Sequence, residues 1–240
     1  MKIPFNEAGY AFLKGGYPYS QGVAALPGYG IERVRLLEPM PMAEGWRFIE
    51  NWLKSQNRPL ISLCACELRS PQPFSFDGFG EFNKGYRAVL EQWTIVRDGL
   101  NPVARSNVAP VGSPPREPCF YAFCYTKPAS SNDFVVAGSG EWPEGGRFPE
   151  DIVARGNTGA DGIRKKAEFV IGKMRARMEG LGVGTPGIAQ VYTAFDFHGV
   201  MADIEALAPS ASVTWHRCRP PIEGLDFEMD LRRVSAERLA

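Results

Sequence analysis

The chain has 240 residues, 44% of them hydrophobic, which suffices for one large domain or two of about 120 residues each. Lysine plus arginine and aspartate plus glutamate number 27 each, so the chain lacks the basic excess that nucleic-acid binding requires. No apolar run approaches the ~18 residues of a membrane span, no secretory signal is visible and the five cysteines suggest no disulfide framework, so we expect a cytoplasmic protein without nucleic-acid or membrane partners.

The first half of the chain predicts helices and strands in alternation. Trp46, Ile49 and Leu53 recur at helical spacing with charged residues opposite them, as in an amphipathic helix. Short apolar and aromatic runs between the helical segments are typical of buried strands. The predicted elements are a helix over 42–56, a strand over 59–68, a helix over 79–96 and a strand over 119–125.

Residues 128–133, rich in turn-forming types, mark the best internal boundary and predict two domains, 1–128 and 129–240. The order of elements then restarts. No glycine-rich phosphate loop follows a first strand, so we expect an α+β fold of two similar units and not a nucleotide-binding doubly wound sheet. The elements predicted here are strands over 134–137, 187–197 and 225–231, and helices over 162–178 and 200–207.

Two segments, one in each half, complement each other. Residues 101–108 carry Arg105 ahead of a Pro/Gly-rich turn and an apolar strand that has no acid. Residues 220–230 have a similar turn and strand with Glu228, but lack an arginine at the position that corresponds to Arg105. The pair indicates a divided duplication in which each copy keeps half of an active site, which favours a small-molecule enzyme.

Several motifs, in the same order, resemble the RidA/YjgF family of enamine/imine deaminases. In the first half, residues 18–23 resemble its Pro-Tyr-x-Gln segment, 82–86 its Asn-x-x-Tyr and 104–108 its Ala-Arg-Ser-Cys-Val signature. In the second half, 136–143 resemble its Thr-Ser-Gly-Gln-x-Pro strand end, and 227–230 resemble its Ile-Glu-Ile-Glu strand. The chain thus resembles a divergent, tandem-duplicated member.

Each half departs from the family pattern at one place. The first closing strand reads Cys-Phe-Tyr-Ala over 119–122, without an acid, and the second half reads Ser-Val-Thr-Trp over 212–215, where the family has its arginine. The resemblance implies two chorismate-mutase-like units, each a mixed sheet with two helices on one face. It also implies trimers whose sites lie in clefts between neighbouring subunits.

The resemblance further implies one complete cleft built from both units. Arg105 is expected to bind the substrate carboxylate, because a planar guanidinium binds a carboxylate bidentately. Glu228 is expected to act as general base or to hold the water that attacks the imine. No metal or organic cofactor is implied. The remaining residues expected to bind substrate are Tyr19, Asn83, Gly138, Ser139 and Gly140.

The activity implied is a hydrolytic deamination that releases ammonia from an enamine or imine carboxylate. By family analogy, a 2-aminomuconate-type dicarboxylate from aromatic degradation fits, with Arg217 or Arg219 near its far carboxylate. The alternative is a non-catalytic module that binds a small carboxylate. Such a module needs Arg105 but not Glu228.

Each candidate residue also has a structural interpretation. Arg105 is equally suited to an internal ion pair, and Glu228 alternates with Asp226 and Asp230 in a pattern that also fits a solvent-facing strand. Asn83 and Tyr19 also fit local packing roles, and Ser139 fits a strand-end turn. The remaining motifs are weaker: Cys64 and Cys66 fit small buried residues on one strand face better than a metal clip, and His198 and His216 accompany no nucleophile motif.

Overall fold

The structure is a computed structural model that describes residues 1–195 and 199–240. The first half of the chain forms β1 (Lys2–Phe5), β2 (Tyr10–Leu13), β3 (Gly22–Ala25), β4 (Tyr29–Pro41), α1 (Met42–Ser55), β5 (Leu63–Arg69), α2 (Phe76–Gln92), β6 (Ala104–Pro110) and β7 (Cys119–Pro128). The second half forms β8 (Phe134–Gly140), α3 (Ala160–Leu181), β9 (Ile188–Thr193), α4 (Met201–Leu207), β10 (Ser212–Arg219), β11 (Phe227–Arg233) and β12 (Ala236–Leu239).

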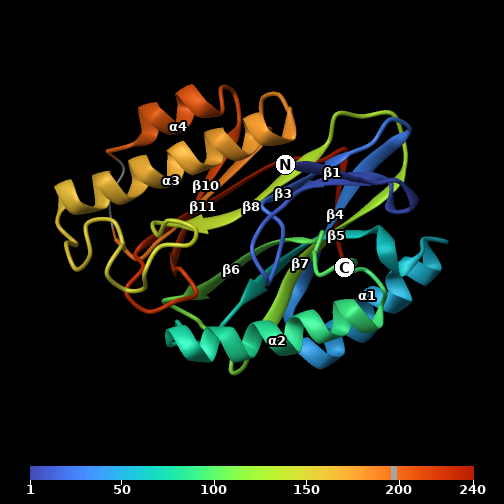
Figure 1. Ribbon diagram of the computed structural model, residues 1–240, viewed down its shortest axis with the longest axis horizontal. Helices are drawn as coiled ribbons and strands as arrows, with labels where there is room; N and C mark the ends of the chain where they lie inside the picture. Colours follow the sequence, from blue (N-terminus) through green and yellow to red (C-terminus); the bar gives the residue numbers. More distant parts are fainter. Residues whose placement is uncertain (196–198) are drawn as a thin grey trace.

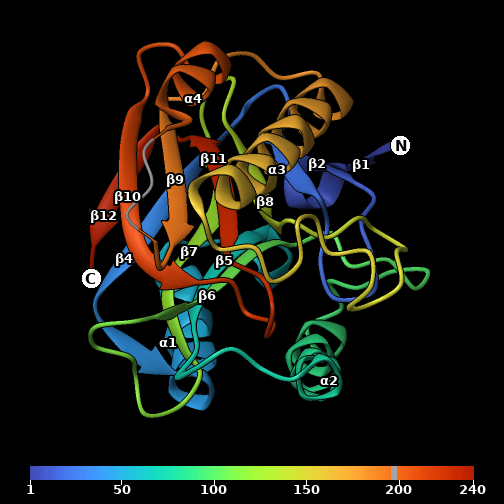
Figure 2. The ribbon, with the colours of Figure 1, turned by 90° about the vertical axis from the view of Figure 1, so that its left-hand side faces the viewer.

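These strands join into one sheet that lies between two pairs of helices. Helices α1 and α2 cover the strands of the first half, and α3 and α4 cover those of the second (Figure 1). Figure 2 shows the two helix pairs on opposite sides of the strands. Within the described ranges the strand order is β1-β2-β3-β8-β11-β9-β10-β6-β5-β7-β4-β12.

The two halves repeat one arrangement of strands and helices. In the first half β5 and β6 are parallel neighbours joined through α2, and β7 runs antiparallel beside β5. In the second half β9 and β10 are parallel neighbours joined through α4, and β11 runs antiparallel beside β9. The predicted α+β fold, with two helices on one face of a mixed sheet in each half, is confirmed.

The apolar faces read from the sequence are the faces that the helices bury. Trp46, Ile49 and Leu53 of α1 pack with α2 against β5 and β7, and form one core with them. Ile163 and Met174 of α3 pack with α4 against β8, β9 and β11 in a second core. Burial of these side chains at roughly 1.5–3 kcal/mol each holds both helix pairs on the sheet.

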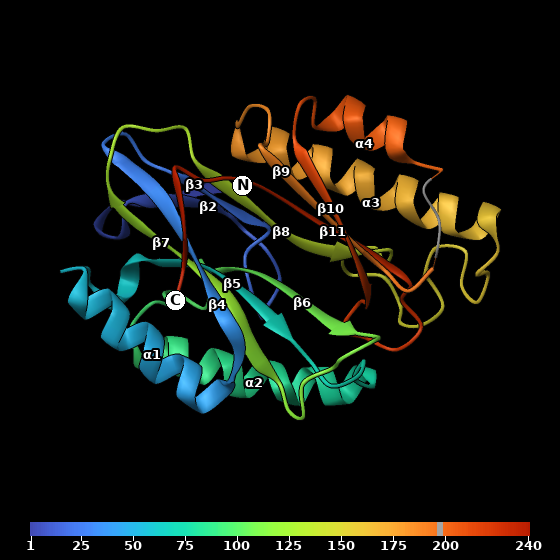
Figure 3. The ribbon, with the colours of Figure 1, turned by 180° about the vertical axis from the view of Figure 1, so that it is seen from behind.

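The terminal strands pair across the two halves. Strand β3 pairs with β8, so the N-terminal strands extend the sheet of the second half. Strand β12 pairs in parallel with β4 of the first half, beside the C-terminus in Figure 3.

The division into domains 1–128 and 129–240 stays a prediction. The strand predicted over 187–197 is shorter in the structure, where β9 ends at Thr193; residues 196–198, among them His198, lie outside the described residues.

The cysteines are buried thiols. All five are free. The expectation that Cys64 and Cys66 share a strand face is wrong, because the pairing of β5 with β7 shifts between Leu63 and Ala65. The two thiols therefore lie in different hydrophobic clusters.

Among the helices in the described part of the chain, none is long and apolar enough to cross a membrane.

A buried network of charged groups joins the two halves. Glu67 of β5 accepts hydrogen bonds from Arg33 of β4 at 2.6 and 2.8 Å and another from Arg232 of β11. Arg232 also donates to Asp230 at 2.6 Å, and Asp230 accepts from Ser106 of β6 at 2.8 Å. Burial opposes ionisation of Glu67, but the charges of Arg232 and Arg33 outweigh it and lower its pKa well below the usual range.

Removal of the Glu67 carboxylate is expected to lower the stability of the fold. Glu67→Ala leaves Arg33 and Arg232 buried without their shared partner, and we expect a loss of about 3–5 kcal/mol in the free energy of unfolding, measured by urea denaturation. The control is Glu81→Ala, because Glu81 pairs with Lys84 on the exposed face of α2 and such pairs contribute at most about 1 kcal/mol. Equal destabilisation by both substitutions would contradict the role given to the network.

Candidate active site

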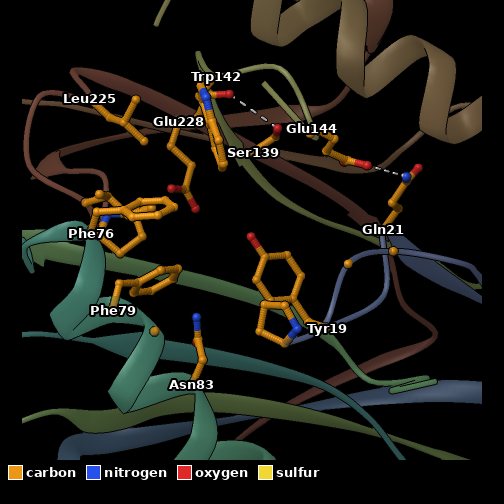
Figure 4. Close-up of a pocket in the computed structure, with 18 of the residues that line it drawn as sticks. Tyr19, Gln21, Phe76, Phe79, Asn83, Ser139, Trp142, Glu144, Leu225 and Glu228 are labelled. Carbon is orange, nitrogen blue, oxygen red and sulfur yellow. Dashed lines mark hydrogen bonds between the residues drawn. The ribbon is translucent and has the colours of Figure 1, made fainter. Parts of the chain in front are cut away.

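Both halves of the chain line a cavity of about 610 Å³. Its wall consists of the loop between β2 and β3, the first turns of α2, the end of β8 with the segment after it, and the residues that lead into β11. Figure 4 shows predicted site residues and their neighbours, whose side chains point into this space from different elements. The predicted site residues in the wall are Tyr19, Asn83, Ser139, Gly140 and Glu228.

Arg105 lies behind Asn83 and Tyr19, enclosed by aromatic rings. Its Nη2 donates to Asn83 Oδ1 at 2.6 Å, and its guanidinium carbon lies 4.7 Å from the ring centre of Tyr19 and 4.6 Å from that of Tyr86. The side chain is buried, and its Nη1 has no hydrogen-bond partner among the described residues. Burial lowers the pKa of this guanidinium. No carboxylate in the described chain forms an ion pair with it, which argues against the structural alternative and favours an anionic ligand.

Glu228 enters the cavity from β11 and is 3% exposed, so the solvent-facing alternative is wrong for it. Burial, with repulsion from Asp230, raises the pKa of Glu228 to about 8, while Arg177 and Arg105 act in the opposite direction. Its carboxyl is therefore largely protonated at neutral pH. Gly138 makes room for it, because a Cβ at that position would lie 2.2 Å from Glu228 Oε1.

A buried ion pair fixes the start of β11. Glu141, which follows β8, accepts hydrogen bonds from the backbone N–H groups of Asp226 and Phe227 at 2.6 and 3.1 Å. Lys166 of α3 donates to Glu141 at 3.1 Å and to Asp226 at 2.8 Å, and both Lys166 and Glu141 are fully buried. These contacts hold the residue before Glu228 against the end of β8. Asp226 thus has a structural partner and does not face solvent as an isolated charge.

The structure adds residues that the sequence patterns did not single out. Arg177 of α3 lines the cavity although it carries no motif, and Phe79 and Trp142 form part of an apolar wall. The apolar spacing of α3 gave no reason to connect Arg177 with a site. Its place at the cavity becomes evident only from the packing of α3 in the fold. Arg217 and Arg219, considered for the far carboxylate, lie on β10 outside this cavity wall.

No metal-binding group is evident in the described ranges. Within them no three His, Cys, Asp or Glu side chains gather as they do around a metal ion. His216 stacks on Tyr192 at 4.9 Å between ring centres and does not line the cavity. The cavity wall carries Arg177, the Glu228 carboxyl, further charged side chains from α2 and from the segment after β8, and aromatic rings, while Arg105 lies behind Asn83.

Comparison with known proteins decides the family. A family model described as 2-aminomuconate deaminase CnbZ matches residues 2–238. The chain belongs to this family. The CnbZ-family chain is 40% identical over 245 residues to the 2-amino-5-chloromuconate deaminase of Comamonas testosteroni, and the match covers 98% of this chain and 97% of that protein. The sequence-based prediction of an aminomuconate-type member is confirmed.

A solved structure of a chorismatase has a similar fold. A crystal structure of a chorismatase matches 90% of the CnbZ-family chain and 77% of its own, with a TM-score of 0.52 and 13% identity, which shows a shared fold alone. The YjgF gene product of E. coli covers 44% of this chain and 82% of its own, with a TM-score of 0.29 and 18% identity.

The raised pKa of Glu228 predicts how this CnbZ-family chain responds to pH. The pKa of Glu228 in the folded protein, about 8, lies above its ordinary value of 4.5. The contribution of Glu228 to the free energy of unfolding is therefore fully present below about pH 4.5 and is lost as pH rises through about 8. Glu228→Gln cannot ionise, so we expect it to match the parent chain near pH 5 and to exceed its stability by a few kcal/mol at pH 9. Thermal unfolding measured across this range, with Glu81→Gln as control, tests this. A pH-independent difference between the two chains would refute it.

Proposed function

We propose that the protein is a hydrolytic deaminase that releases ammonia from a 2-aminomuconate-type enamine dicarboxylate. The observation that carries the proposal is that Glu228 from one half lines a cavity whose opposite half contributes Asn83, with the buried Arg105 hydrogen-bonded directly behind it. The names of the matching family and of its relative from Comamonas testosteroni support the substrate class. Trimeric assembly, cytoplasmic location and independence of cofactors stay predictions from the sequence.

Arg105 is suited to the carboxylate beside the amino-bearing carbon. Asn83 fixes one guanidinium nitrogen, and Nη1 keeps an unused N–H. The rings of Tyr19 and Tyr86 exclude water on either side, so a charge-assisted hydrogen bond formed there is worth about 1.5–3 kcal/mol. A bound carboxylate also supplies the counter-charge that this buried cation lacks among the described residues.

Glu228 is suited to move every proton that the reaction requires. As a neutral acid it donates a proton to the chain carbon of the enamine, and the C–N bond becomes an iminium. The resulting carboxylate takes a proton from the water that attacks the iminium carbon, which gives a carbinolamine. Glu228 then protonates the amino group, the C–N bond breaks, ammonia leaves, and the hydroxyl proton returns to Glu228 as the ketone forms. One water is consumed, and Glu228 ends protonated, as it began.

Substitution separates an enzyme from a mere binder. We expect Glu228→Gln to lower kcat for ammonia release from freshly prepared 2-aminomuconate by roughly 10²–10⁴-fold with little change in KM, because the amide keeps the shape but transfers no proton. Arg105→Lys is expected to raise KM, since an ammonium cannot replace the planar guanidinium. Both values come from an assay of ammonia against the spontaneous rate. A Glu228→Gln variant with unchanged kcat would favour the non-catalytic carboxylate-binding module.

The pH profile follows from the same carboxyl. The first step requires protonated Glu228, so kcat/KM is expected to fall as pH rises through about 8, about tenfold for each further pH unit. Steady-state rates between pH 6 and pH 10, corrected for spontaneous hydrolysis at each pH, measure it. A rate that instead rises through pH 8 would show that Glu228 acts first as a base.

A further inference from the structure

A second buried arginine borders the cavity. Arg177 of α3 is 4% exposed and belongs to the cavity wall. Its Nη1 donates to the backbone carbonyls of Ala137 and Gly138 at 2.8 and 3.2 Å, which fixes the guanidinium beside the end of β8. Its Nε is buried and has no hydrogen-bond partner within the described chain. Arg177 therefore has donor capacity beyond what the fold uses.

The side chain that faces Arg177 is itself a carboxylate. Glu144, exposed on the connection between β8 and α3, accepts from Arg177 Nη2 at 2.9 Å and from Gln21 Nε2 at 2.8 Å. Lys173 Nζ lies 3.6 Å from the same carboxylate. Burial opposes its ionisation, but Arg177 and Lys173 outweigh it and lower the pKa of Glu144. Three donors thus surround one carboxylate at the edge of the cavity.

This carboxylate site and Asn83, the hydrogen-bond partner of Arg105, border the cavity at different places. Figure 4 shows the Glu144–Gln21 pair apart from Asn83, which holds Arg105, with the Glu228 carboxyl also directed into the space that they border. Both arginines are near enough to Glu228 to lower its pKa. The proton-transfer group therefore lies near two separate guanidinium groups, an arrangement that complements a ligand with two carboxylates.

We propose that Arg177 and Gln21 bind the second carboxylate of a dicarboxylate substrate, in the place that the Glu144 carboxylate takes in this structure. Arg105 binds the first carboxylate, and Glu228 faces the reacting carbons between them. The inference rests on the proposed deaminase function and adds the group that selects dicarboxylates over monocarboxylates.

The exchange is electrostatically balanced. One carboxylate replaces another on Arg177, so the buried guanidinium keeps a counter-charge throughout. Glu144 is exposed and leaves for water, where a carboxylate is well solvated. A monocarboxylate has no group to displace Glu144, so it gains nothing at this end. Glu144 thereby discriminates between the two ligand classes.

Two stable diene acids test the subsite without turnover. Muconate carries a carboxylate at both ends, and sorbate is the same diene acid with a methyl group in place of one carboxylate. We expect calorimetric titration of the full-length protein to show muconate binding at least about tenfold tighter than sorbate. Arg177→Met is expected to weaken muconate binding by about 10- to 100-fold and to leave sorbate binding within about twofold. Arg175→Met, on the exposed face of the same helix, is the matched control.

Substitution of Glu144 is expected to change the affinity for muconate in the opposite direction from substitution of Arg177. Glu144→Gln removes the competing charge, so muconate is expected to bind about threefold to tenfold tighter, with sorbate unchanged. A merely structural role of Glu144 in holding Arg177 predicts weaker binding of both acids. Arg177→Lys, a milder substitution, repeats the test if Arg177→Met does not fold, and is expected to weaken muconate binding alone.

Several outcomes would overturn the inference. These are equal affinity of the parent chain for the two acids, equal weakening of both by Arg177→Met, or weaker muconate binding in Glu144→Gln. Failure of the deaminase proposal is separate, because it concerns ammonia release. A chain that releases no ammonia but binds muconate through Arg177 retains the subsite. If the protein releases ammonia but its affinity for muconate does not depend on Arg177, the subsite proposal fails and the deaminase proposal stands.

Discussion

The hydrogen bond between Ser106 and Asp230 joins the two halves of the chain at the point where the site is built. Ser106 follows Arg105 on β6, and Asp230 lies two residues after Glu228 on β11. Asp230 is held in turn by Arg232 and, through it, by Glu67. Since a buried charge without its partner is strongly unfavourable, this network permits essentially one register between the halves. The positions of the two key side chains follow from that register.

The same proximity sets the chemistry. Asp230 is fixed as a partner of Arg232 and lies close to Glu228, so its charge adds to burial in keeping the Glu228 carboxyl protonated. The fold thus uses one carboxylate to hold the structure and, through it, keeps the proton on another. Arg105 shows the complementary case, a buried cation enclosed by the rings of Tyr19 and Tyr86. Arg105, which has a buried N–H without a partner in the described chain, would be more favourable beside an anionic ligand than in the protein alone.

The sequence predicted the parts of the fold that local patterns encode. Trp46, Ile49 and Leu53 repeat at helical spacing, so α1 was recognisable, and the motif around Arg105 located the first half of the site. Strand β10 was missed because its residues alternate exposed and half-buried without an apolar run. Arg177 was missed because its role depends on the packing of α3 beside β8, a contact far apart in sequence. The pairing of β3 with β8 depends on long-range contacts of the same kind.

The exchange of terminal strands has a consequence for how the chain is made. Strand β4 pairs with β7 on one side and with β12 on the other, and β12 comes after every other described strand in the sequence. During synthesis, β4 therefore keeps an open edge until the residues of β12 have emerged from the ribosome, and open edges invite pairing with other chains. Strand β3 likewise cannot pair with β8 until β8 has been synthesised, more than a hundred residues later in the sequence. The sheet reaches its final form only after β12 has emerged from the ribosome and paired with β4.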